Sequence, residues 1–324
     1  MSLPAQPVRI LVAGLGAFGR EHLARLMVRP DVAVVGVADT QSTALEGVRR
    51  NHPKLVCLAD PLQLIDDTKA DAIVIATPAS SHVEIAVRAL KCNLCVLLEK
   101  PIAPSVVAAA PLLAAAKAST GFVLPGHVLR FSKDHARLVE IVRSGEIGEI
   151  IYVNSRRYRD DSHALRYADT DPILMTSIHD IDLAQWVTKS DFRSVRARRS
   201  GAGSRSMTSI SATTANGVTC DLRTAWTFTD GDLPPDRLEV VGDRGSAELI
   251  AGLGLSVYAS GRRTEYSAIT ADDPLCNEHE HFLTCVRDRS TTPSIGLANA
   301  LAGLQLADAA IESLRLNREV LLSP

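Results

Sequence analysis

Short apolar segments alternate with helix-periodic segments through the first part of the chain. The apolar segments read VRILVAGLG, VAVVGVAD, LVCL, DAIVIATP and LCVLLEKP, and amphipathic or polar segments separate them. Strands that alternate with helices are joined by right-handed crossovers into a parallel sheet. Runs such as AIVIAT are apolar at nearly every position, which is typical of strands covered on both faces. The pattern predicts an α/β fold with a doubly wound parallel sheet over residues 1–124.

The pattern changes beyond Pro125–Gly126. A helical segment and a strand lead into the helix-periodic stretch PILMTSIHDIDLAQW, and alternating segments follow, among them MTSISATTA, VTCDLRTAWTF and DRLEVVG. Consecutive strands with short turns predict a large, mostly antiparallel open sheet with helices on one face. We therefore expect a C-terminal α+β domain over residues 125–324. The other face of its sheet needs a cover, so we expect a homodimer or homotetramer formed through that sheet.

Charge and hydropathy narrow the class of partner. The 324 residues carry a formal net charge of −2, so there is no basic field to hold a phosphate backbone, and nucleic acid is not expected as the main partner. No apolar run approaches the roughly 20 residues that span a bilayer, and the first residues, MSLPAQPVRI, lack a signal-peptide pattern. We expect a cytoplasmic protein that acts on a small molecule, with no membrane partner.

Cysteine and histidine spacings do not predict a metal site. Cys92 and Cys95 have the spacing of half a zinc site, but no second pair completes it. His279 and His281 are two residues apart, so on a helix they point to different faces. We expect the cysteines to be reduced and mostly buried, and the Cys92/Cys95 pair to be structural.

A glycine-rich motif follows the first predicted strand. Gly14 permits a tight turn, Gly16 lets a pyrophosphate approach the backbone, and Gly19 lets the following helix pack closely on the strand. Asp39 ends the second predicted strand, where a carboxylate that binds the adenosine ribose is expected. No Arg follows it to neutralise a 2′-phosphate, so the sequence favours NAD over NADP. The alternative is a plain glycine turn beside a solvated aspartate.

A second motif, Glu99-Lys100-Pro101, lies at the carboxyl end of the fifth predicted strand. Ligands bind at this end of the strands in open α/β sheets, although the charged pair can also simply terminate a strand. We assign Glu99 and Lys100 to the cofactor site. The other residues that we assign to that site, besides the three glycines and Asp39, are Ala17, Phe18, Thr77, Pro78 and His82.

These features together resemble the glucose-fructose oxidoreductase, inositol dehydrogenase and rhizopine-catabolism family (Gfo/Idh/MocA). The glycine motif, Glu99-Lys100-Pro101, the stretch His179-Asp180-Ile181-Asp182 and the C-terminal helical tail carry the resemblance, which spans nearly the whole chain. It implies a Rossmann domain followed by an α/β domain whose open sheet often forms a subunit interface. It also implies a nicotinamide-dependent reaction on a sugar, polyol or inositol.

The catalytic prediction centres on His179. On a helix, Met175, His179, Asp182 and Trp186 share a face because of their spacing. A neutral His179 can take the alcohol proton as hydride leaves the substrate carbon. Lys100 would stabilise the developing alkoxide, or serve as the base itself if desolvation lowers its pKa. Asp182 is our candidate for orienting the imidazole, and the alternative is a buried His–Asp pair that only packs.

Substrate contacts are expected from two segments that precede the His179 helix in the sequence. Side chains at the end of the strand IIYVNSRRYRD can bind hydroxyls or a carboxylate, and the family resemblance places His127 and Arg130 near substrate. The predicted substrate-binding residues are Lys100, His127, Arg130, Arg157, Tyr158, His163, Met175 and His179.

Met175 departs from the family pattern, which has an aspartate four residues before the histidine. This departure supports a second class of function, a non-catalytic sensor or regulator that binds the cofactor on the same fold. The leading hypothesis remains an NAD-dependent dehydrogenase that acts on a secondary alcohol.

Overall fold

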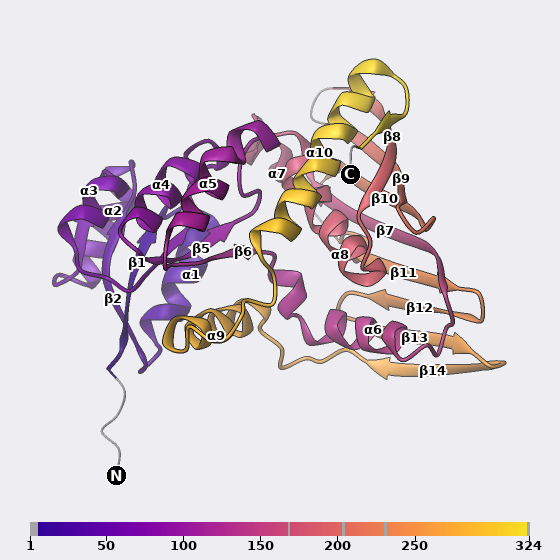
Figure 1. The fold of residues 1–324 in the computed structure, drawn as a ribbon, viewed down its shortest axis with the longest axis horizontal. Coiled ribbons are helices and arrows are strands. Elements are labelled where there is room, and N and C mark those ends of the chain that lie inside the picture. Colours follow the sequence, from indigo (N-terminus) through magenta and orange to yellow (C-terminus); the bar gives the residue numbers. More distant parts are fainter. Residues whose placement is uncertain (1–5, 168, 203–204, 230–231, 323–324) are drawn as a thin grey trace, which may run out of the picture. The chain divides into compact units, whose positions relative to one another are not determined.

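The computed structural model describes residues 6–167, 169–202, 205–229 and 232–322 (Figure 1). The chain divides into unit 1, Met1–Gly126 with Leu275–Leu301, and unit 2, His127–Pro274 with Ala302–Pro324. No helix in the described part of the chain is long and apolar enough to cross a membrane.

The return of a C-terminal segment to unit 1 differs from the sequence interpretation, which had one continuous second domain over residues 125–324. Phe282 of the returning segment is 1% exposed, and its ring packs edge-on against Phe122 with the centroids 5.7 Å apart. Burying an aromatic ring of this size stabilises a fold strongly, so the apolar face of the segment explains why the chain comes back.

Unit 1 contains a six-stranded sheet in the order β3-β2-β1-β4-β5-β6, in which every neighbouring pair is parallel. Its strands are β1 (Val8–Ala13), β2 (Val32–Ala38), β3 (Val56–Leu58), β4 (Ala72–Ile75), β5 (Cys95–Glu99) and β6 (Val123–Gly126). β4 and β5 are buried at every position, as their continuous apolar sequences require. The predicted doubly wound parallel sheet is confirmed, and its strand order reverses between β1 and β4.

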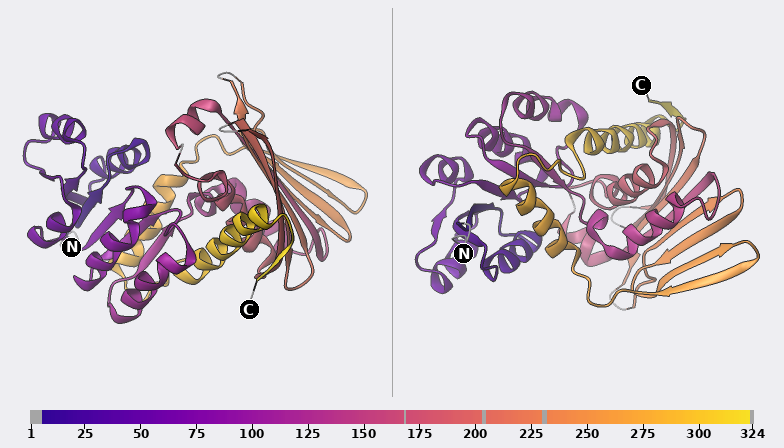
Figure 2. Two further views of the ribbon diagram at one scale, coloured as in Figure 1. Left: turned by 90° about the horizontal axis from the view of Figure 1, so that it is seen from above. Right: turned by 60° about the horizontal axis from the view of Figure 1, so that its bottom comes forward.

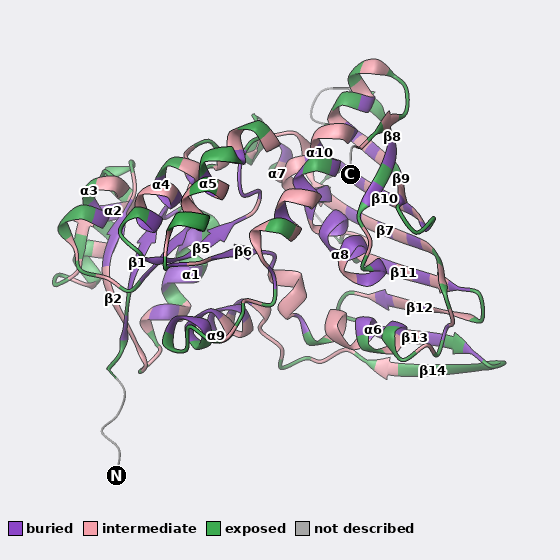
Figure 3. Cartoon of the chain, in the orientation of Figure 1, coloured by how far each residue is buried: buried purple, intermediate pink, exposed green. Residues whose placement is uncertain are grey.

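Helices cover both faces of this sheet, with α4 and α5 on one side and α1 and α9 on the other (Figure 3). The helices are α1 (Ala17–Met27), α2 (Ser42–Asn51), α3 (Pro61–Asp67), α4 (Ala79–Lys91), α5 (Val106–Ala118) and α9 (Pro274–Arg287). Local sequence sets some of the starts: Asp60 accepts the Leu62 N–H before α3, and Ser105 accepts the Ala108 N–H before α5. Such caps satisfy backbone donors that have no partner inside the helix.

Unit 2 is built on a nine-stranded sheet in the order β14-β13-β12-β11-β7-β10-β9-β8-β15. Only β7 and β10 pair in parallel, and the other described pairs are antiparallel. The strands are β7 (Ile150–Asp160), β8 (Phe192–Ala202), β9 (Arg205–Thr214), β10 (Thr219–Phe228), β11 (Arg237–Gly242), β12 (Gly245–Ile250), β13 (Gly254–Ala259), β14 (Arg262–Ser267) and β15 (Val320–Leu321). The predicted mostly antiparallel sheet is confirmed.

The helices of unit 2 lie on one face of this sheet, as the edge-on view in Figure 2 shows. They are the 3₁₀ turn η1 (Val128–Phe131), α6 (Lys133–Arg143), α7 (Asp161–Arg166), the π turn η2 (Ile173–Ser177), α8 (Ile178–Thr188) and most of α10 (Leu297–Leu316). Leu138, Ile181 and Leu306 from three of these helices are fully buried in the same core as Val153 and Val240 of the sheet. The alternation of apolar residues along the strands is what turns one face of the sheet toward these helices.

Candidate active site

The residues predicted to bind the cofactor all lie in unit 1, at one edge of the parallel sheet. The glycine turn follows β1, Asp39 follows β2, Thr77 follows β4 and Lys100 follows β5. Parallel strands end at the same edge, and the order reversal between β1 and β4 is where open α/β sheets bind ligands. The sequence therefore identified one contiguous edge of the sheet.

The glycine turn has the geometry that a dinucleotide requires. Gly14 has φ +92°, and a Cβ there would lie 2.5 Å from the Ala76 carbonyl oxygen. A Cβ on Gly19 would lie 2.0 Å from the Gly14 carbonyl oxygen, whereas a Cβ on Gly16 would meet no atom within 4 Å. Gly14 and Gly19 thus serve the turn and the close helix packing, and Gly16 leaves backbone open to a pyrophosphate. The residues present fit NAD.

Asp39 holds the glycine turn from the neighbouring strand. One carboxylate oxygen accepts the Leu15 N–H at 2.6 Å, and the other accepts the Gln41 N–H at 2.8 Å. Each oxygen keeps a further lone pair for an external hydroxyl. A carboxylate in this position can accept ribose hydroxyls and repel a phosphate group.

His82 is placed differently from the other predicted cofactor residues, because its side chain is only 1% exposed. Its Nδ1 lies 2.9 Å from the Pro101 carbonyl oxygen and its Nε2 lies 2.7 Å from the Thr77 carbonyl oxygen. Burial lowers the pKa of His82, although both carbonyl groups oppose this shift. The ring therefore links the turn after β4 to the turn after β5 from inside the protein.

Glu99 is also an internal residue, at 5% exposure, whereas Lys100 is half-buried. One carboxylate oxygen of Glu99 lies 3.1 Å from His22 Nε2, and the other accepts the Lys100 backbone N–H at 3.3 Å. The Lys100–Pro101 peptide bond is cis. Glu99 thus holds the backbone that presents Lys100 at the edge of the sheet.

In unit 2, His179 lies in the first turn of α8 and is half-buried. The structure changes the helix before it: residues Ile173–Ser177 form a π turn, so Met175 does not continue the α-helical spacing that the sequence suggested. Trp226 donates its indole N–H to the Thr176 hydroxyl at 2.9 Å, and the His163 ring packs edge-on against Trp226 at 5.0 Å. Single π turns often occur at functional sites. This one contains Met175 and ends two positions before His179, and both are predicted substrate residues.

Asp182 of α8 and Arg130 of η1 form a buried ion pair. Both carboxylate oxygens accept from the Arg130 guanidinium, at 2.9 and 2.8 Å, and His127 Nδ1 lies 3.6 Å from the carboxylate. The guanidinium also lies 5.5 Å from the centre of the Trp186 ring. The structure thus brings together His127, Arg130 and Asp182, and a bidentate pair of this kind fixes all of its members. Their roles toward His179 and substrate stay predictions.

Arg157 and Tyr158 do not share a face of β7. Arg157 is 5% exposed and binds both oxygens of Asp180 at 3.1 Å, and it also pairs with Asp236. Tyr158 lies on the other face, where the Arg156 guanidinium is 5.4 Å from its ring. The geometry favours a positioning role for Arg157 over direct contact with substrate, because its donors are directed at these two carboxylates.

The ion pairs of Arg157 continue to Arg159, which binds both oxygens of Asp236 at 2.9 and 3.0 Å. Burial raises the pKa of Asp180, against the effect of Arg157. Burial also acts to raise the pKa of Asp236, but Arg157 and Arg159 outweigh it and the pKa falls below its usual value. Sequence reasoning missed Asp236 and Trp226, since neither lies in a motif; Asp180 was visible only as a member of the His179 stretch.

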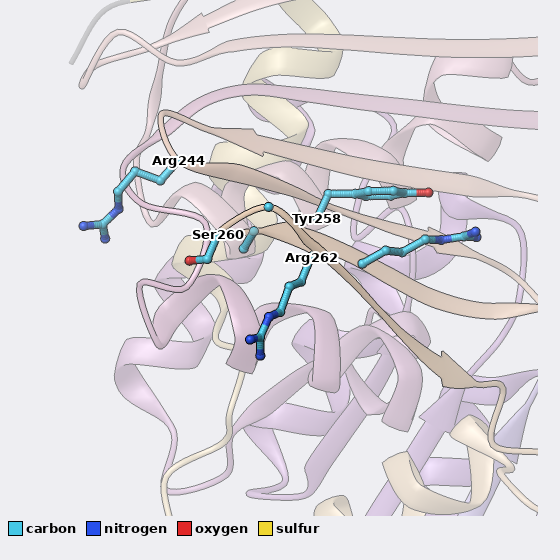
Figure 4. Close-up of a pocket in the computed structure, with 7 residues that line it drawn as sticks. Arg244, Tyr258, Ser260 and Arg262 are labelled. Atoms are coloured by element: carbon cyan, nitrogen blue, oxygen red, sulfur yellow. The ribbon is translucent and has the colours of Figure 1, made fainter.

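A hollow at the turn between β13 and β14 differs from the predicted cofactor and substrate sites (Figure 4). It is lined by Arg244, Tyr258, Ser260, Arg262 and their neighbours. The labelled side chains diverge from one another and do not converge on one point. None of the predicted site residues lies there.

Comparisons with known proteins agree with both halves of the chain. A family model described as an oxidoreductase family with an NAD-binding Rossmann fold matches residues 8–127. The model of the Gfo/Idh/MocA C-terminal domain matches residues 135–248. An inositol 2-dehydrogenase from Salmonella paratyphi B is 29% identical over 188 residues, and this match spans 57% of the chain and 56% of that protein. An inositol 2-dehydrogenase from Rubrobacter xylanophilus is 27% identical, over 96% of the chain and 92% of that protein.

The fold is also similar to solved structures. A scyllo-inositol dehydrogenase from Lactobacillus casei, solved with NAD(H) and scyllo-inositol, superposes with a TM-score of 0.83 at 17% identity, over 98% of this chain and 99% of that chain. At this identity the likeness shows the fold alone. Because the two family models cover most of the sequence, the chain belongs to the Gfo/Idh/MocA family of oxidoreductases, with the NAD-binding Rossmann fold in its N-terminal half.

Proposed function

We propose that this protein is an NAD-dependent dehydrogenase that transfers a hydride between the nicotinamide and a secondary alcohol of a sugar, sugar acid or inositol. The observation that carries the proposal is the edge of the parallel sheet where β2, β1 and β5 end, which bears Asp39, the open glycine turn and Lys100, whose backbone Glu99 holds. The inositol 2-dehydrogenases among its relatives support the substrate class.

The proposed chemistry assigns one step to each of two residues. NAD, when bound, supplies the hydride acceptor. His179 removes the proton of the reacting hydroxyl, which requires a neutral imidazole near pH 7. The Lys100 ammonium stabilises the negative charge that develops on the alcohol oxygen; Lys100 can serve as the base instead, if desolvation lowers its pKa.

His127, Arg130 and Met175 are proposed to shape the substrate site around α8. Arg130 holds the Asp182 side chain in place. Asp182 and His179 lie on the same helix, α8, so we propose that the fixed Asp182 orients the His179 ring. Met175 supplies no carboxylate, which means that a different group must bind the hydroxyl that the family aspartate would bind.

The test is a panel of inositols, sugars and sugar acids with NAD, followed by the nicotinamide absorbance. On a substrate that turns over, His179→Ala and Lys100→Ala are each expected to lower kcat by about a hundredfold or more, the scale of lost acid–base catalysis. His52→Ala, at the end of α2, is the matched control and should keep the wild-type kcat. Near-wild-type kcat in His179→Ala would show that this histidine only packs.

Because Met175 replaces the family aspartate, we also consider a second function, that of a sensor that binds NAD without turnover. The same panel separates the two, because turnover of any member excludes the sensor. A sensor would instead bind NAD and one of the polyols, measured by calorimetry, with no change in absorbance.

For the cofactor, we propose that Asp39 sets the preference for NAD. Asp39→Ala should weaken NAD binding and reduce discrimination against NADP, because the carboxylate that repels the 2′-phosphate is gone. A wild-type kcat/KM that is higher with NADP than with NAD would contradict the assignment.

We further propose that the open face of the nine-stranded sheet forms a homo-oligomer interface. That face carries half-buried polar pairs, such as Tyr152 with Asp221 at 2.8 Å and Arg223 with Asn154 at 2.9 Å. A monomeric mass by light scattering at micromolar concentration would rule this out.

A further inference from the structure

Unit 1 contains a buried group of titratable side chains beneath the sheet edge. His22 comes from α1, Glu99 from β5, and Glu278 and His279 from the returning helix α9. Their exposures are 0%, 5%, 0% and 1%. One donor atom each from His22, Glu99 and Glu278 lies within 4.8 Å of the others. Two carboxyl groups this close and this far from water cannot both carry a charge without compensation.

The hydrogen bonds in this group run in one direction. An ionised Glu99 only accepts, so His22 must donate its Nε2–H to Glu99 across 3.1 Å. A neutral His22 then accepts the His279 Nε2–H at its Nδ1, across 2.8 Å. Glu99 accepts the Lys100 backbone N–H with its other oxygen. With both imidazoles neutral, this arrangement gives the chain from His279 to Lys100 one charged group, the Glu99 carboxylate.

Glu278 stands beside this chain without joining it. Neither of its carboxyl oxygens has a hydrogen-bond partner among the described residues. Burial, and then the charge of Glu99, raise the pKa of Glu278 well above its usual value. A second negative charge here would face the charge of Glu99 in the same buried space, so a proton or a cation must neutralise it.

Either a proton or a divalent cation can remove it. A cation would draw on three donor atoms, fewer than the four that structural zinc sites use. His22 Nε2 and Glu99 Oε1 are already joined by a hydrogen bond. A proton requires no further ligand and leaves that hydrogen bond intact.

We propose that Glu278 is a neutral carboxylic acid in the folded protein, and that the group His22–Glu99–Glu278–His279 positions the backbone of Lys100. Through it the returning helix α9 sets the edge of the sheet where Lys100 acts. The part that concerns Lys100 rests on the proposed function, whereas the protonation of Glu278 does not. All four are positioning residues, since each is at most 5% exposed.

Infrared spectroscopy tests the proton directly. A protonated carboxyl has a carbonyl band at higher frequency than a carboxylate, and wild-type protein at neutral pH should show one such buried band that Glu278→Gln lacks. Elemental analysis of the same samples provides the second readout and should find no metal that depends on Glu278. Absence of the band, or a stoichiometric divalent metal that Glu278→Gln loses, would overturn the proposal, and neither result depends on turnover.

Glu99→Gln tests the link to Lys100. Removing the charge while keeping the shape should speed amide hydrogen exchange in the peptide that contains Lys100. It should also lower kcat about tenfold, as small misplacements of catalytic groups do, while the NAD Kd changes less than about twofold. Glu84→Gln on α4, an exposed glutamate, is the matched control and should change neither quantity.

The outcomes separate the two proposals. Unchanged exchange at Lys100 in Glu99→Gln overturns the positioning, whatever the activity is. A fall in kcat without faster exchange overturns it as well, because the loss then has another cause. Wild-type protein that turns over no polyol contradicts the proposed function and leaves the exchange and infrared results to decide this one.

Discussion

Each unit places a buried carboxyl group close to a second one: Glu278 lies close to the buried Glu99 in unit 1, and the buried Asp180 shares Arg157 with the half-buried Asp236 in unit 2. In unit 2, Arg157 and Arg159 supply two guanidinium groups to the two aspartates. In unit 1 Glu99 lies against an imidazole and accepts a backbone N–H, and burial raises the pKa of Glu278. The comparison teaches that guanidinium groups oppose the effect of burial on a carboxyl pKa, partly at Asp180 and fully at Asp236, whereas at Glu278 burial and the charge of Glu99 act in the same direction.

The largest effect should come from removing the cation in unit 2. Arg157→Ala leaves Asp180 buried without its partner, and losing one member of a buried ion pair typically costs about 3–5 kcal/mol of unfolding free energy. Urea denaturation measures this. The matched control is Arg159→Ala, whose side chain is 30% exposed, and it should cost about 1 kcal/mol or less. Equal losses in the two variants would show that Arg157 does not hold a buried charge.

Neutral isosteres compare the two units directly. Asp180→Asn removes the charge that Arg157 binds and should cost about 1.5–3 kcal/mol, the range of a hydrogen bond to a charged group. Glu278→Gln replaces a carboxyl that we propose is already neutral, so its cost should stay within about 1 kcal/mol. Both values come from the same denaturation experiment. A larger loss in Glu278→Gln than in Asp180→Asn would reverse the comparison.

Smaller effects should appear in the pH dependence of stability, with opposite signs. The raised pKa of Glu278 means that its contribution is present below its usual value of 4.5 and is lost as the pH rises through the folded value. Burial, and then Arg157, lower the pKa of His135 to about 4 from 6.5, so its contribution is present above 6.5 and is lost as the pH falls toward 4.

The check is the melting temperature of wild type, Glu278→Gln and His135→Gln between about pH 4 and about pH 9, the range over which both linkages act. Glu278→Gln should flatten the wild-type decline on the alkaline side, and His135→Gln should flatten the decline on the acid side. The comparison uses differences in melting temperature between the variants and wild type. The absolute value is less informative, because the two units can unfold separately. If melting temperature changes with pH in the same way in all three proteins, neither Glu278 nor His135 contributes to the pH dependence of stability.

Local patterns predicted the parts of the molecule that depend on neighbours in the sequence. Continuous apolar runs identified β4 and β5, and the glycine spacing located the turn whose geometry excludes a Cβ at Gly14 and Gly19. Alternation also explains why Arg157 and Tyr158 lie on opposite faces of β7, because successive side chains of a strand point to opposite faces.

The rest depended on contacts distant in sequence. His22 and His279 are 257 positions apart, and nothing in the two local sequences links them; the spacing of His279 and His281 pointed only to different helix faces. The π turn before His179 has the apolar period of an ordinary helix, yet Thr176 is bound by Trp226, 50 positions later. Pairings of this kind follow from the tertiary fold, and single-sequence patterns do not contain them.

The return of residues 275–301 to unit 1 also sets an order of events during biosynthesis. A ribosome that has finished residue 126 must still add residues 127–274 before the returning segment exists, which at about 5–20 residues per second takes on the order of ten seconds or more. Throughout that interval the nascent Rossmann sheet has His22 and Glu99 but neither Glu278 nor His279. The edge that presents Lys100 is therefore among the last parts of the protein to mature, after nearly all of the chain has been translated.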